Sequence, residues 1–265
     1  MPKPRRPKLG QHFLADARFR RRIVEALSLR PDDLVIEIGA GRGAMTSLLA
    51  ERARHVVAIE LDSGLAVHLR EVFTEEPRIE ILTSDILCTD IAEICRWHET
   101  ETCVVFGNLP YYITSPIVQH LLASRAWLRG MTLLVQREVA ERLTAEPGTR
   151  AYGYLSVLAQ LYAHPRLLFA VPPGAFAPPP RVRSALVGFR MQPRFPAWNP
   201  EDNAGFLDFV KRCFAQKRKM LLNNLSQTCT RTRVERELAA LGLSPNLRAE
   251  QLTLEQFAAL FTRLR

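Results

Sequence analysis

From about residue 34 onward, short runs of β-branched and aliphatic residues alternate with helical stretches, and this alternation restricts the fold more than any other feature. Elements that alternate in this way build a parallel sheet covered by helices. The first four strand runs are nearly all apolar, which predicts burial on both faces of the sheet. The proline-rich connection Pro172–Pro180 predicts a stiff, exposed loop between the last two strands. The expected strands are Leu34–Ile38, His55–Glu60, Ile79–Thr83, Cys103–Gly107, Met131–Gln136, Arg166–Val171 and Ala185–Arg190.

Helical periodicity fills the intervals between these strands and continues after the last one. Three prolines interrupt the pattern near its end, and we predict a linker over residues 192–200. The chain is therefore expected to be α/β, with a doubly wound domain at residues 1–191 and a small all-α domain at residues 201–265. The expected helices are Ala44–Arg52, Gly64–Val72, Pro116–Ser124, Glu138–Thr144, Tyr154–Tyr162, Phe206–Leu222, Arg233–Leu241 and Leu254–Leu264.

Positive charge is concentrated at the two ends of the chain. The formal net charge is +9, divided into +7 for residues 1–30, −3 for residues 31–190 and +5 for residues 191–265. Segregated positive charge attracts a phosphate backbone, so a nucleic acid is the expected partner. A membrane is the least favoured partner, because no apolar run reaches the 20 residues or so needed to cross a bilayer and no basic amphipathic helix stands out.

The cysteines argue against a disulfide framework and against a bound metal. There are five of them, an odd number, with no CxxC spacing, and the six histidines form no HxxxH pair. The N-terminus has no apolar segment of the kind found in secretory signals. We therefore expect reduced thiols, no metal and a cytoplasmic protein.

A glycine-rich turn follows the first expected strand and is the first candidate ligand site. Gly39 and Gly41 let the backbone approach a ligand closely, and the helix that follows favours polar or anionic groups. The same letters satisfy the G-x-G-x-x-A dinucleotide fingerprint, so NAD, another nucleotide cofactor and a turn without ligand all remain open. Glu60 ends the second strand about 20 residues further on, where a carboxylate can accept both hydroxyls of a ribose.

The ends of the third and fourth strands favour a methyl donor over NAD. Asp85 ends the third strand, and its carboxylate can accept a hydrogen bond from an adenine amino group. Asn108, Leu109, Pro110 and Tyr111 follow the fourth strand, in a loop that lines the ligand cleft of a doubly wound sheet. The Asn108 side chain and the Leu109 or Pro110 carbonyl can accept both N–H groups of an exocyclic amine, while Tyr111 stacks on the ring. An isolated turn of this composition would usually be structural only.

Together these motifs resemble the rRNA adenine N6-dimethyltransferase family, and specifically its bacterial small-subunit (16S rRNA dimethyladenosine transferase) branch. The resemblance runs through nearly the whole chain. It implies a Rossmann-like S-adenosylmethionine-dependent methyltransferase sheet followed by a small C-terminal all-α domain. The segments that carry it are Leu9–Leu14, Glu37–Thr46, the Glu60 strand, Ser84-Asp85, Gly107–Ile117, Leu133–Leu143, Val171–Phe176, Pro178, Pro180, Val182, Ser184, Phe214–Lys219 and Asn223–Leu225.

The resemblance also implies roles for individual residues. The adenine site and catalytic residues would be Asn108, Leu109, Pro110, Tyr111 and Phe176. The S-adenosylmethionine contacts would be His12, which replaces the Asn of many members, with Leu14, Gly39, Gly41, Glu60, Asp85 and Asn108. The substrate would be 16S rRNA in an immature small ribosomal subunit, where two adjacent adenosines in a hairpin loop near the 3′ end are dimethylated at N6 by a monomeric enzyme.

The basic segments at the two ends of the chain are expected to hold the RNA. We predict that the trio Lys217–Lys219 lies on the solvent side of one long helix, whose buried face carries Phe214, Leu221 and Leu225. The predicted RNA-binding residues are Lys8, Arg21, Arg22, Lys217, Arg218 and Lys219.

Three other functions compete with this prediction. A dehydrogenase would share the sheet but has no use for the Asn108 loop, and a non-catalytic RNA-binding or assembly factor would not need an intact cofactor turn. A large-subunit, macrolide-resistance-like adenine methyltransferase would share the Asn108 loop but typically lacks the segment Val171–Phe176.

Overall fold

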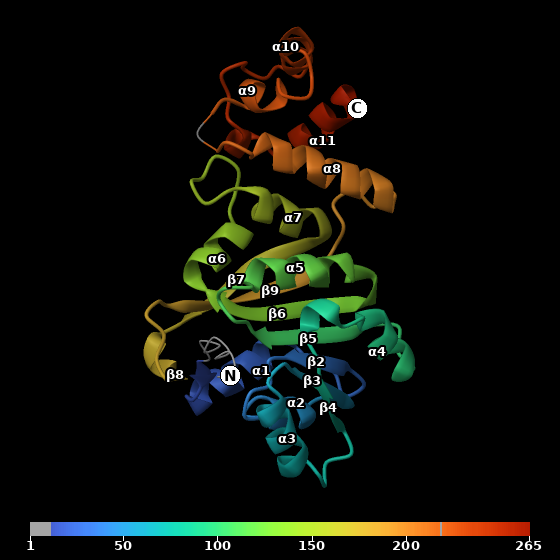
Figure 1. The fold of residues 1–265 in the computed structure, drawn as a ribbon, viewed down its shortest axis with the longest axis vertical. Coiled ribbons are helices and arrows are strands. Elements are labelled where there is room, and N and C mark those ends of the chain that lie inside the picture. The colour runs from blue at the N-terminus through green and yellow to red at the C-terminus, as the bar shows by residue number, and fades with distance from the viewer. Residues whose placement is uncertain (1–11, 218) are drawn as a thin grey trace, which may run out of the picture. The chain divides into compact units, whose positions relative to one another are not determined.

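A computed structural model describes residues 12–217 and 219–265, which form two compact units (Figure 1). None of the described helices combines the length and the hydropathy needed to cross a bilayer. Unit 1 consists of Met1–Ala140 and Arg166–Met191, and unit 2 consists of Glu141–Pro165 and Gln192–Arg265.

The two units divide the chain differently from the domains expected from the sequence. Residues 141–165 were expected in the N-terminal domain, yet their contacts group them with the C-terminal helices. The sequence shows only the order of elements along the chain. Tertiary contacts, which the sequence does not show, decide to which unit residues 141–165 belong. Residues 192–199 contain no helix or strand, and the next helix begins at Pro200.

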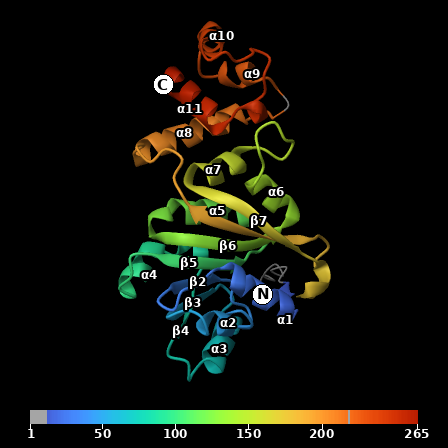
Figure 2. The ribbon, with the colours of Figure 1, turned by 180° about the vertical axis from the view of Figure 1, so that it is seen from behind.

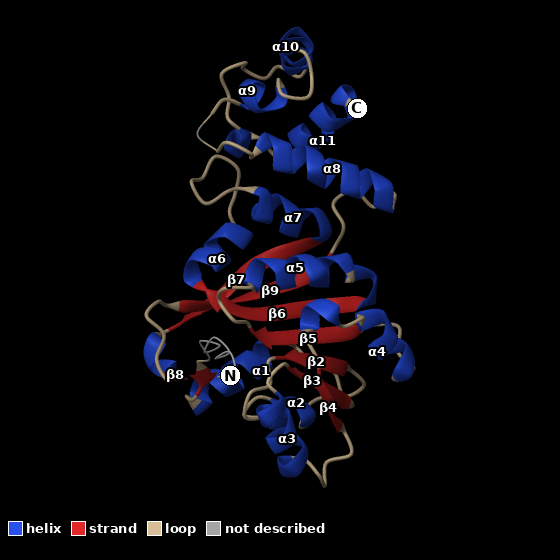
Figure 3. Ribbon diagram, in the orientation of Figure 1, coloured by secondary structure: helices blue, strands red, loops and turns tan. Residues whose placement is uncertain are grey.

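A seven-stranded sheet forms the centre of unit 1, as the red strands in Figure 3 show. Strands β2 to β6 are parallel to their neighbours, and β9 is antiparallel to β6. All seven expected strands are present, and the predicted doubly wound α/β fold is confirmed. In sheet order the strands are β4 (Ile79–Thr83), β3 (His55–Glu60), β2 (Leu34–Ile38), β5 (Cys103–Asn108), β6 (Leu128–Gln136), β9 (Ser184–Met191) and β7 (Ala163–Val171).

The four strands expected to be buried on both faces differ in their surroundings. β2, β3 and β5 lie inside the sheet and are almost entirely buried. The prediction is wrong for β4, where Glu80 and Thr83 are exposed and the other residues are only half-buried. The reason is position, because β4 is the outermost strand at one edge of the sheet; β7 forms the other edge (Figure 2).

Helices α1 (Ala17–Ala26) and α2 (Thr46–Ala50) cover one face of the sheet. Ile23 and Leu49 belong to the same buried cluster as Val35, Val56 and Val104 on the strands. Burying a side chain of this size contributes about 1.5–3 kcal/mol. α1 was not predicted, because its basic first half hides the apolar period. The other helices of unit 1 include α3 (Ser63–Val72), α4 (Ile91–Trp97), which was also not predicted, and α5 (Thr114–Ala123).

A second, two-stranded sheet joins the start of the described chain to the loop after β7. β1 (Phe13–Leu14) pairs antiparallel with β8 (Phe176–Ala177), with Leu14 opposite Phe176. Two residues are too few to show an alternating pattern, so the sequence predicted neither strand. This pairing places Phe13 opposite Ala177, 164 positions later in the chain.

Unit 2 is helical and packs around aromatic side chains. Phe206 lies with its ring centroid 5.8 Å from that of Phe261 and 5.2 Å from that of Trp198, both near edge-to-face. The main helices are α7 (Tyr154–Tyr162), α8 (Pro200–Cys213), α9 (Leu221–Leu225), α10 (Arg231–Ala240) and α11 (Leu254–Leu264), with α6 (Arg137–Leu143) at the boundary between the units in sequence.

The long helix predicted over Phe206–Leu222 is wrong. α8 ends at Cys213, and residues 214–217 and 219–220 are not helical before α9 begins. Asn224 explains the break, because its buried amide donates hydrogen bonds to the carbonyls of Cys213, at 2.7 Å, and Gln216, at 3.3 Å. These bonds satisfy carbonyls that a continuing helix would have used.

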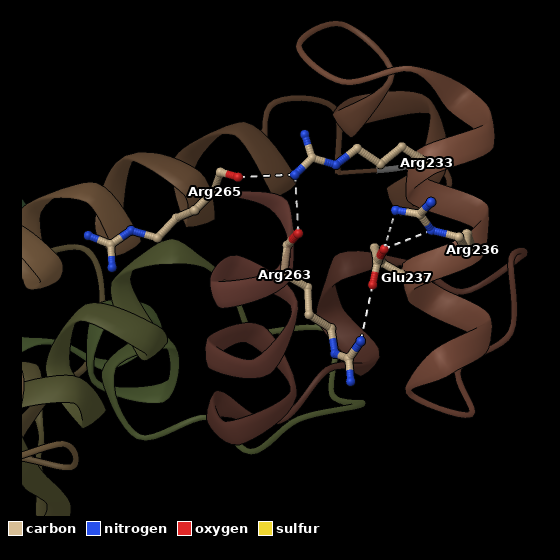
Figure 4. Close-up of polar contacts among 5 residues, drawn as sticks. All are labelled: Arg233, Arg236, Glu237, Arg263 and Arg265. Atoms are coloured by element: carbon tan, nitrogen blue, oxygen red, sulfur yellow. Dashed lines mark hydrogen bonds and ion pairs between the residues drawn. The ribbon is translucent and has the colours of Figure 1, made fainter.

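Ion pairs connect α10 to the end of α11 (Figure 4). Glu237 is only 8% exposed and accepts hydrogen bonds from Arg236, at 2.8 and 2.9 Å, and Arg263, at 3.1 Å. These bonds, first from Arg236 and then from Arg263, hold the pKa of Glu237 below its ordinary value. Arg233 donates to the carbonyls of Arg263 and Arg265 at the C-terminal end of α11. These three guanidinium groups therefore stabilise unit 2 internally.

Candidate active site

A cavity lies at the carboxyl ends of β2, β3, β4 and β5 in unit 1, where a doubly wound sheet binds its ligands. Nine of the eleven residues predicted for cofactor binding or catalysis contribute to its wall. They are His12, Gly39, Gly41, Glu60, Asp85, Asn108, Leu109, Pro110 and Tyr111.

The glycine turn after β2 needs glycine for its backbone geometry. Gly39 and Gly41 have φ values of +74° and +61°, in the left-handed region that other residues rarely adopt. A Cβ atom at Gly41 would also stand 2.8 Å from Cε1 of Phe13. The turn is therefore both strained for other residues and closely covered by the β1 segment.

Glu60 fixes this turn with its side chain. Its Oε2 accepts a hydrogen bond from the Gly41 amide at 2.8 Å, and its Oε1 accepts one from the Asp62 amide at 2.9 Å. The residue is 4% exposed and still reaches the cavity wall. A carboxylate has about four acceptor positions, so two remain for a ligand.

Glu37 is a buried carboxyl group that the sequence analysis did not single out. It lies within β2, is 2% exposed, and accepts a hydrogen bond from the Thr46 hydroxyl at 2.6 Å. Burial raises its pKa to about 7, and the charge of nearby Glu60 acts in the same direction. The signal available in the sequence was one acidic residue inside an otherwise apolar strand.

Asp85 begins a short 3₁₀ turn (Ile86–Cys88) after β4. Its Oδ1 accepts a hydrogen bond from the Leu87 amide at 2.9 Å, which fixes the carboxylate at the cavity wall. The other carboxylate oxygen, Oδ2, accepts no side-chain or loop hydrogen bond from the residues that the structure describes. The residue therefore has the geometry of a fixed acceptor.

The Asn108 amide is held by a residue almost a hundred positions earlier. Its Nδ2 donates a hydrogen bond to the His12 carbonyl at 3.0 Å. This bond fixes the plane of the amide, and Oδ1 accepts no hydrogen bond from any described residue. Asn108 therefore presents a pre-oriented acceptor at the cavity wall.

Of the two carbonyls considered as the second acceptor, only one is unoccupied by the described residues. The Pro110 carbonyl accepts hydrogen bonds from the Ile113 amide, at 3.2 Å, and the Thr114 hydroxyl, at 3.1 Å. The Leu109 carbonyl accepts none within the described chain, while the Leu109 amide is bound to the Leu134 carbonyl at 3.0 Å. The geometry thus favours Leu109 as the second acceptor.

Tyr111 is fixed at both ends of its side chain. Its hydroxyl is 2.8 Å from the Ser184 hydroxyl, and its ring stacks on the ring of His12 with centroids 5.9 Å apart. Burial raises the pKa of Tyr111, which keeps the phenol neutral. His12 in turn donates from Nδ1 to the Pro178 carbonyl at 2.8 Å.

Two predicted site residues do not contribute to the cavity wall. Leu14 and Phe176 pair with each other in the small sheet and are 6% and 4% exposed within the hydrophobic core. The exposed aromatic residue on the cavity wall is instead Tyr112, which is 62% exposed. The sequence could not distinguish Phe176 from Tyr112, because both are aromatic residues in proline-rich loops.

The predicted RNA-binding residues are divided among different surroundings. Lys8 and Arg218 lie outside the described residues. Arg21 and Arg22 are exposed on α1, and the Arg22 guanidinium lies 3.9 Å from the centroid of the Phe169 ring. Lys217 and Lys219 are exposed but lie in the turn after α8, not on a helix face as predicted, and Lys217 donates to the Arg150 carbonyl at 2.7 Å.

A doubly wound sheet with a glycine turn, acidic strand ends and an Asn-Leu-Pro-Tyr loop defines the class of Rossmann-like methyltransferases. A family model described as "Ribosomal RNA adenine dimethylase" matches residues 3–265, and the chain belongs to that family. It is therefore a methyltransferase, and the family predicted from the sequence is confirmed.

Curated relatives and solved structures agree with this assignment. The chain is 41% identical to "Ribosomal RNA small subunit methyltransferase A" of Koribacter versatilis, over 98% of this chain and 95% of the relative. It is 44% identical to the protein of the same name from Acidobacterium capsulatum, over 98% and 91%.

Among solved structures, the 23S rRNA methyltransferase ErmE has a TM-score of 0.74 at 30% identity, covering 95% of this chain and 99% of that one. A dimethyladenosine transferase from Plasmodium falciparum has a TM-score of 0.77 at 22% identity, covering 94% and 96%, and supports the fold. The fold class predicted from the sequence is thus confirmed by both comparisons.

Proposed function

We propose that this protein methylates N6 of adenosine in small-subunit ribosomal RNA, with S-adenosylmethionine as the methyl donor. The observation that carries the proposal is the fixed Asn108 amide beside the unoccupied Leu109 carbonyl, in the cavity that also holds Glu60. Relatives at 41–44% identity carry the small-subunit name, which supports this choice of RNA. The finer proposal is dimethylation of two adjacent adenosines in a hairpin loop near the 3′ end of 16S rRNA, within an immature subunit.

The cofactor roles follow from the acceptors on the cavity wall. Glu60 has acceptor positions for two ribose hydroxyls, and Asp85 has one for an adenine amino group. Gly39 and Gly41 allow the backbone to approach the cofactor closely. His12 on the cavity wall, the Asn108 backbone and Leu14 remain proposed contacts. When bound, S-adenosylmethionine supplies an electrophilic methyl group.

The residues of the Asn108 loop suit the chemistry of an adenine amino group. The lone pair of this nitrogen is delocalised into the ring, which makes it a weak nucleophile. Asn108 Oδ1 and the Leu109 carbonyl accept its two N–H bonds and orient the lone pair towards the methyl donor. Fixed acceptors of this kind act through positioning and electrostatics. As the new N–C bond formed, the S–CH3 bond of the donor would break and leave a neutral thioether, and the cationic nitrogen would then release its proton to water.

The target base must leave its stack to enter the cavity, and Tyr111 is placed to receive it. Its ring is held between the Ser184 hydroxyl and the His12 ring, so little side-chain freedom is lost on binding. Stacking of a base on an aromatic ring contributes about 1–3 kcal/mol, which offsets part of the unstacking cost. A stacking role for Phe176 remains a proposal that requires movement of this buried side chain.

The test is methylation of ribosomal particles by the purified protein. Small subunits from a strain without this modification, mixed with S-adenosylmethionine, should yield N6,N6-dimethyladenosine by mass spectrometry, at two adjacent positions by primer extension. Large subunits should yield none. Methylation of large-subunit RNA only would favour the activity in the name of the ErmE structure, and NADH binding by calorimetry would favour a dehydrogenase.

The remaining expectations concern the state of the protein. No group of side chains suited to a metal ion occurs among the described residues, and the proposed chemistry uses none. A monomer, action on an immature subunit and a cytoplasmic location are proposals. Light scattering on the purified protein, and cofractionation with subunit precursors in sucrose gradients, test the first two.

A further inference from the structure

The segment Pro178–Ser184 is attached at both ends to the proposed adenine site. At one end, the Pro178 carbonyl accepts the hydrogen bond from His12 Nδ1 at 2.8 Å. At the other end, the Ser184 hydroxyl lies 2.8 Å from the Tyr111 hydroxyl. His12 and Tyr111 both belong to the cavity wall and stack on each other. The segment is therefore anchored at both ends to residues of the cavity wall.

Two arginines lie in the middle of this segment. Arg183 is adjacent to the Ser184 anchor, and Arg181 is three residues from either anchor, which is at most about 10 Å of chain. The backbone here is not free, because the Arg183 carbonyl accepts a hydrogen bond from the Arg137 amide at 3.0 Å. The backbones of both residues are therefore within about 10 Å of an anchor to the cavity wall.

The guanidinium groups of Arg181 and Arg183 have no side-chain partner among the described residues. Both are exposed, as is Val182 between them at 45%. Neither guanidinium has an ion pair or a side-chain hydrogen bond within residues 12–217 and 219–265. By contrast, Arg129 is paired with Asp33 in the same unit. Two unpaired cations thus stand beside a cavity whose wall carries the carboxyl groups of Glu60 and Asp85.

The carboxyl groups of the cavity wall repel the phosphates of an RNA substrate, and the two arginines offset this repulsion. Residues 31–190 carry a net charge of −3, so this part of the chain repels a phosphate backbone as a whole. A base enters the cavity only if its own phosphates come to the rim. Guanidinium groups bind phosphate through paired N–H donors and stay charged at every physiological pH.

We propose that Arg181 and Arg183 bind the RNA phosphates that flank the unstacked target adenosine. This inference rests on the proposed function, because it takes the cavity as the adenine site. It adds a contact within the acidic middle of the chain, in addition to the basic segments at its two ends. Because these contacts lie next to the target base, the two arginines should bind the short RNA loop that contains it, both alone and within the whole subunit.

The test is the salt dependence of RNA binding by Arg181→Gln/Arg183→Gln in the full-length protein. The ligand is a fluorescent RNA hairpin with two adjacent adenosines in its loop, titrated between about 50 and 200 mM salt. Two lost phosphate contacts should lower the log–log salt slope by about 1.4–1.8. The ratio of wild-type to variant affinity should therefore shrink by about tenfold across this range. Arg181→Lys/Arg183→Lys should keep most of the slope.

Arg30→Gln/Arg52→Gln is the matched control, because it removes the same charge. Both residues are exposed and lie in the connections that lead into β2 and β3, at the opposite edge of the parallel sheet from the cavity. The control should bind the hairpin with the wild-type slope, and all variants should bind S-adenosylmethionine equally in calorimetry. Equal loss in control and test variants would overturn the proposal, since net charge would then explain it.

Two further outcomes separate this proposal from the proposed function. If wild-type protein methylates small subunits but the test variant keeps the wild-type salt slope, the phosphate contact is wrong and the function stands. If wild-type protein methylates no adenosine but the slope falls as expected, the function is wrong and the rim still binds RNA. Weaker binding to whole subunits with an unchanged hairpin slope would assign these arginines to a protein contact, which also overturns the proposal.

Discussion

At the scale of single residues, Asn108 depends on a bond to the backbone of His12, and this dependence makes its role testable. Asn108→Ala should lower the rate of methyl transfer by roughly 10²-fold or more, because a preorganised acceptor is lost. Single-turnover assays with radiolabelled donor measure this rate. Affinities for cofactor and RNA should remain close to wild type, since the proposed cofactor contact of Asn108 is made by its backbone and the basic segments provide the RNA contacts. A variant with nearly the wild-type rate would show that Asn108 is not an acceptor in catalysis.

The raised pKa of Glu37 predicts how the stability of the folded protein changes with pH. Its folded-state pKa is raised from about 4.5 to about 7, so between these values the folded chain keeps a proton that the unfolded chain releases. Stability should therefore fall as pH rises through this window, by up to about 1.4 kcal/mol per unit. Glu37→Gln should flatten the dependence, measured as urea midpoints at about pH 5 and pH 7. Glu51→Gln, at an exposed position, should keep the wild-type slope.

At the residue scale, the sequence predicted which residues meet but not how they are held. Gly39, Glu60 and Asp85 follow strands, and the carboxyl ends of parallel strands meet at one edge, so their convergence is a consequence of topology. The bond from Asn108 to His12 joins residues 96 positions apart and depends on the β1 segment. Phe176 is buried because it pairs with Leu14 in strands too short to be predicted.

At the scale of elements, the turn between α8 and α9 depends on one buried amide. Asn224→Ala should destabilise the protein by about 1–3 kcal/mol, because the carbonyls of Cys213 and Gln216 lose their donor. Thermal unfolding followed by circular dichroism measures the change. The adjacent Asn223→Ala is the control, since the side chain of this half-buried residue makes no such bond to any described residue and should shift stability by less than about 0.5 kcal/mol. Equal effects at the two positions would contradict this account of the turn.

Helices and strands could be predicted from the sequence wherever one spacing of apolar residues continues over enough positions. The strands Leu34–Ile38, His55–Glu60 and Ile79–Thr83 have the predicted bounds, as do the helices Tyr154–Tyr162 and Leu254–Leu264. The predicted helix Phe206–Leu222 failed because apolar spacing continues through residues 214–220, whereas the hydrogen bonds of Asn224 end the helix. Side-chain hydrogen bonds to a helix end do not change the spacing of the apolar residues, so this spacing does not predict where the helix ends.

At the scale of the whole molecule, basic residues differ in how many partners they already have. Lys219 is exposed in the turn after α8, whereas Lys217 already donates to the Arg150 carbonyl. Replacing Lys217, Arg218 and Lys219 with Ala should weaken binding to immature small subunits and lower the salt slope by up to about 2. Filter binding over a salt series measures the slope. Lys211→Ala, whose ammonium lies 3.3 Å from the Asp208 carboxylate, should have little effect. An unchanged slope in the triple variant would leave this turn without a role in RNA binding.

The hydrogen bonds made by His12, Asn108 and Ser184 also constrain the order in which the protein becomes active during its own synthesis. His12 is translated 172 residues before Ser184, yet both contact Tyr111 at the proposed adenine site. A nascent chain has all the parallel strands that contact the cofactor cavity well before it has β9, so cofactor binding can precede the ability to hold the target base. Ribosome-bound fragments that end between Gln136 and Ser184 should therefore be catalytically silent.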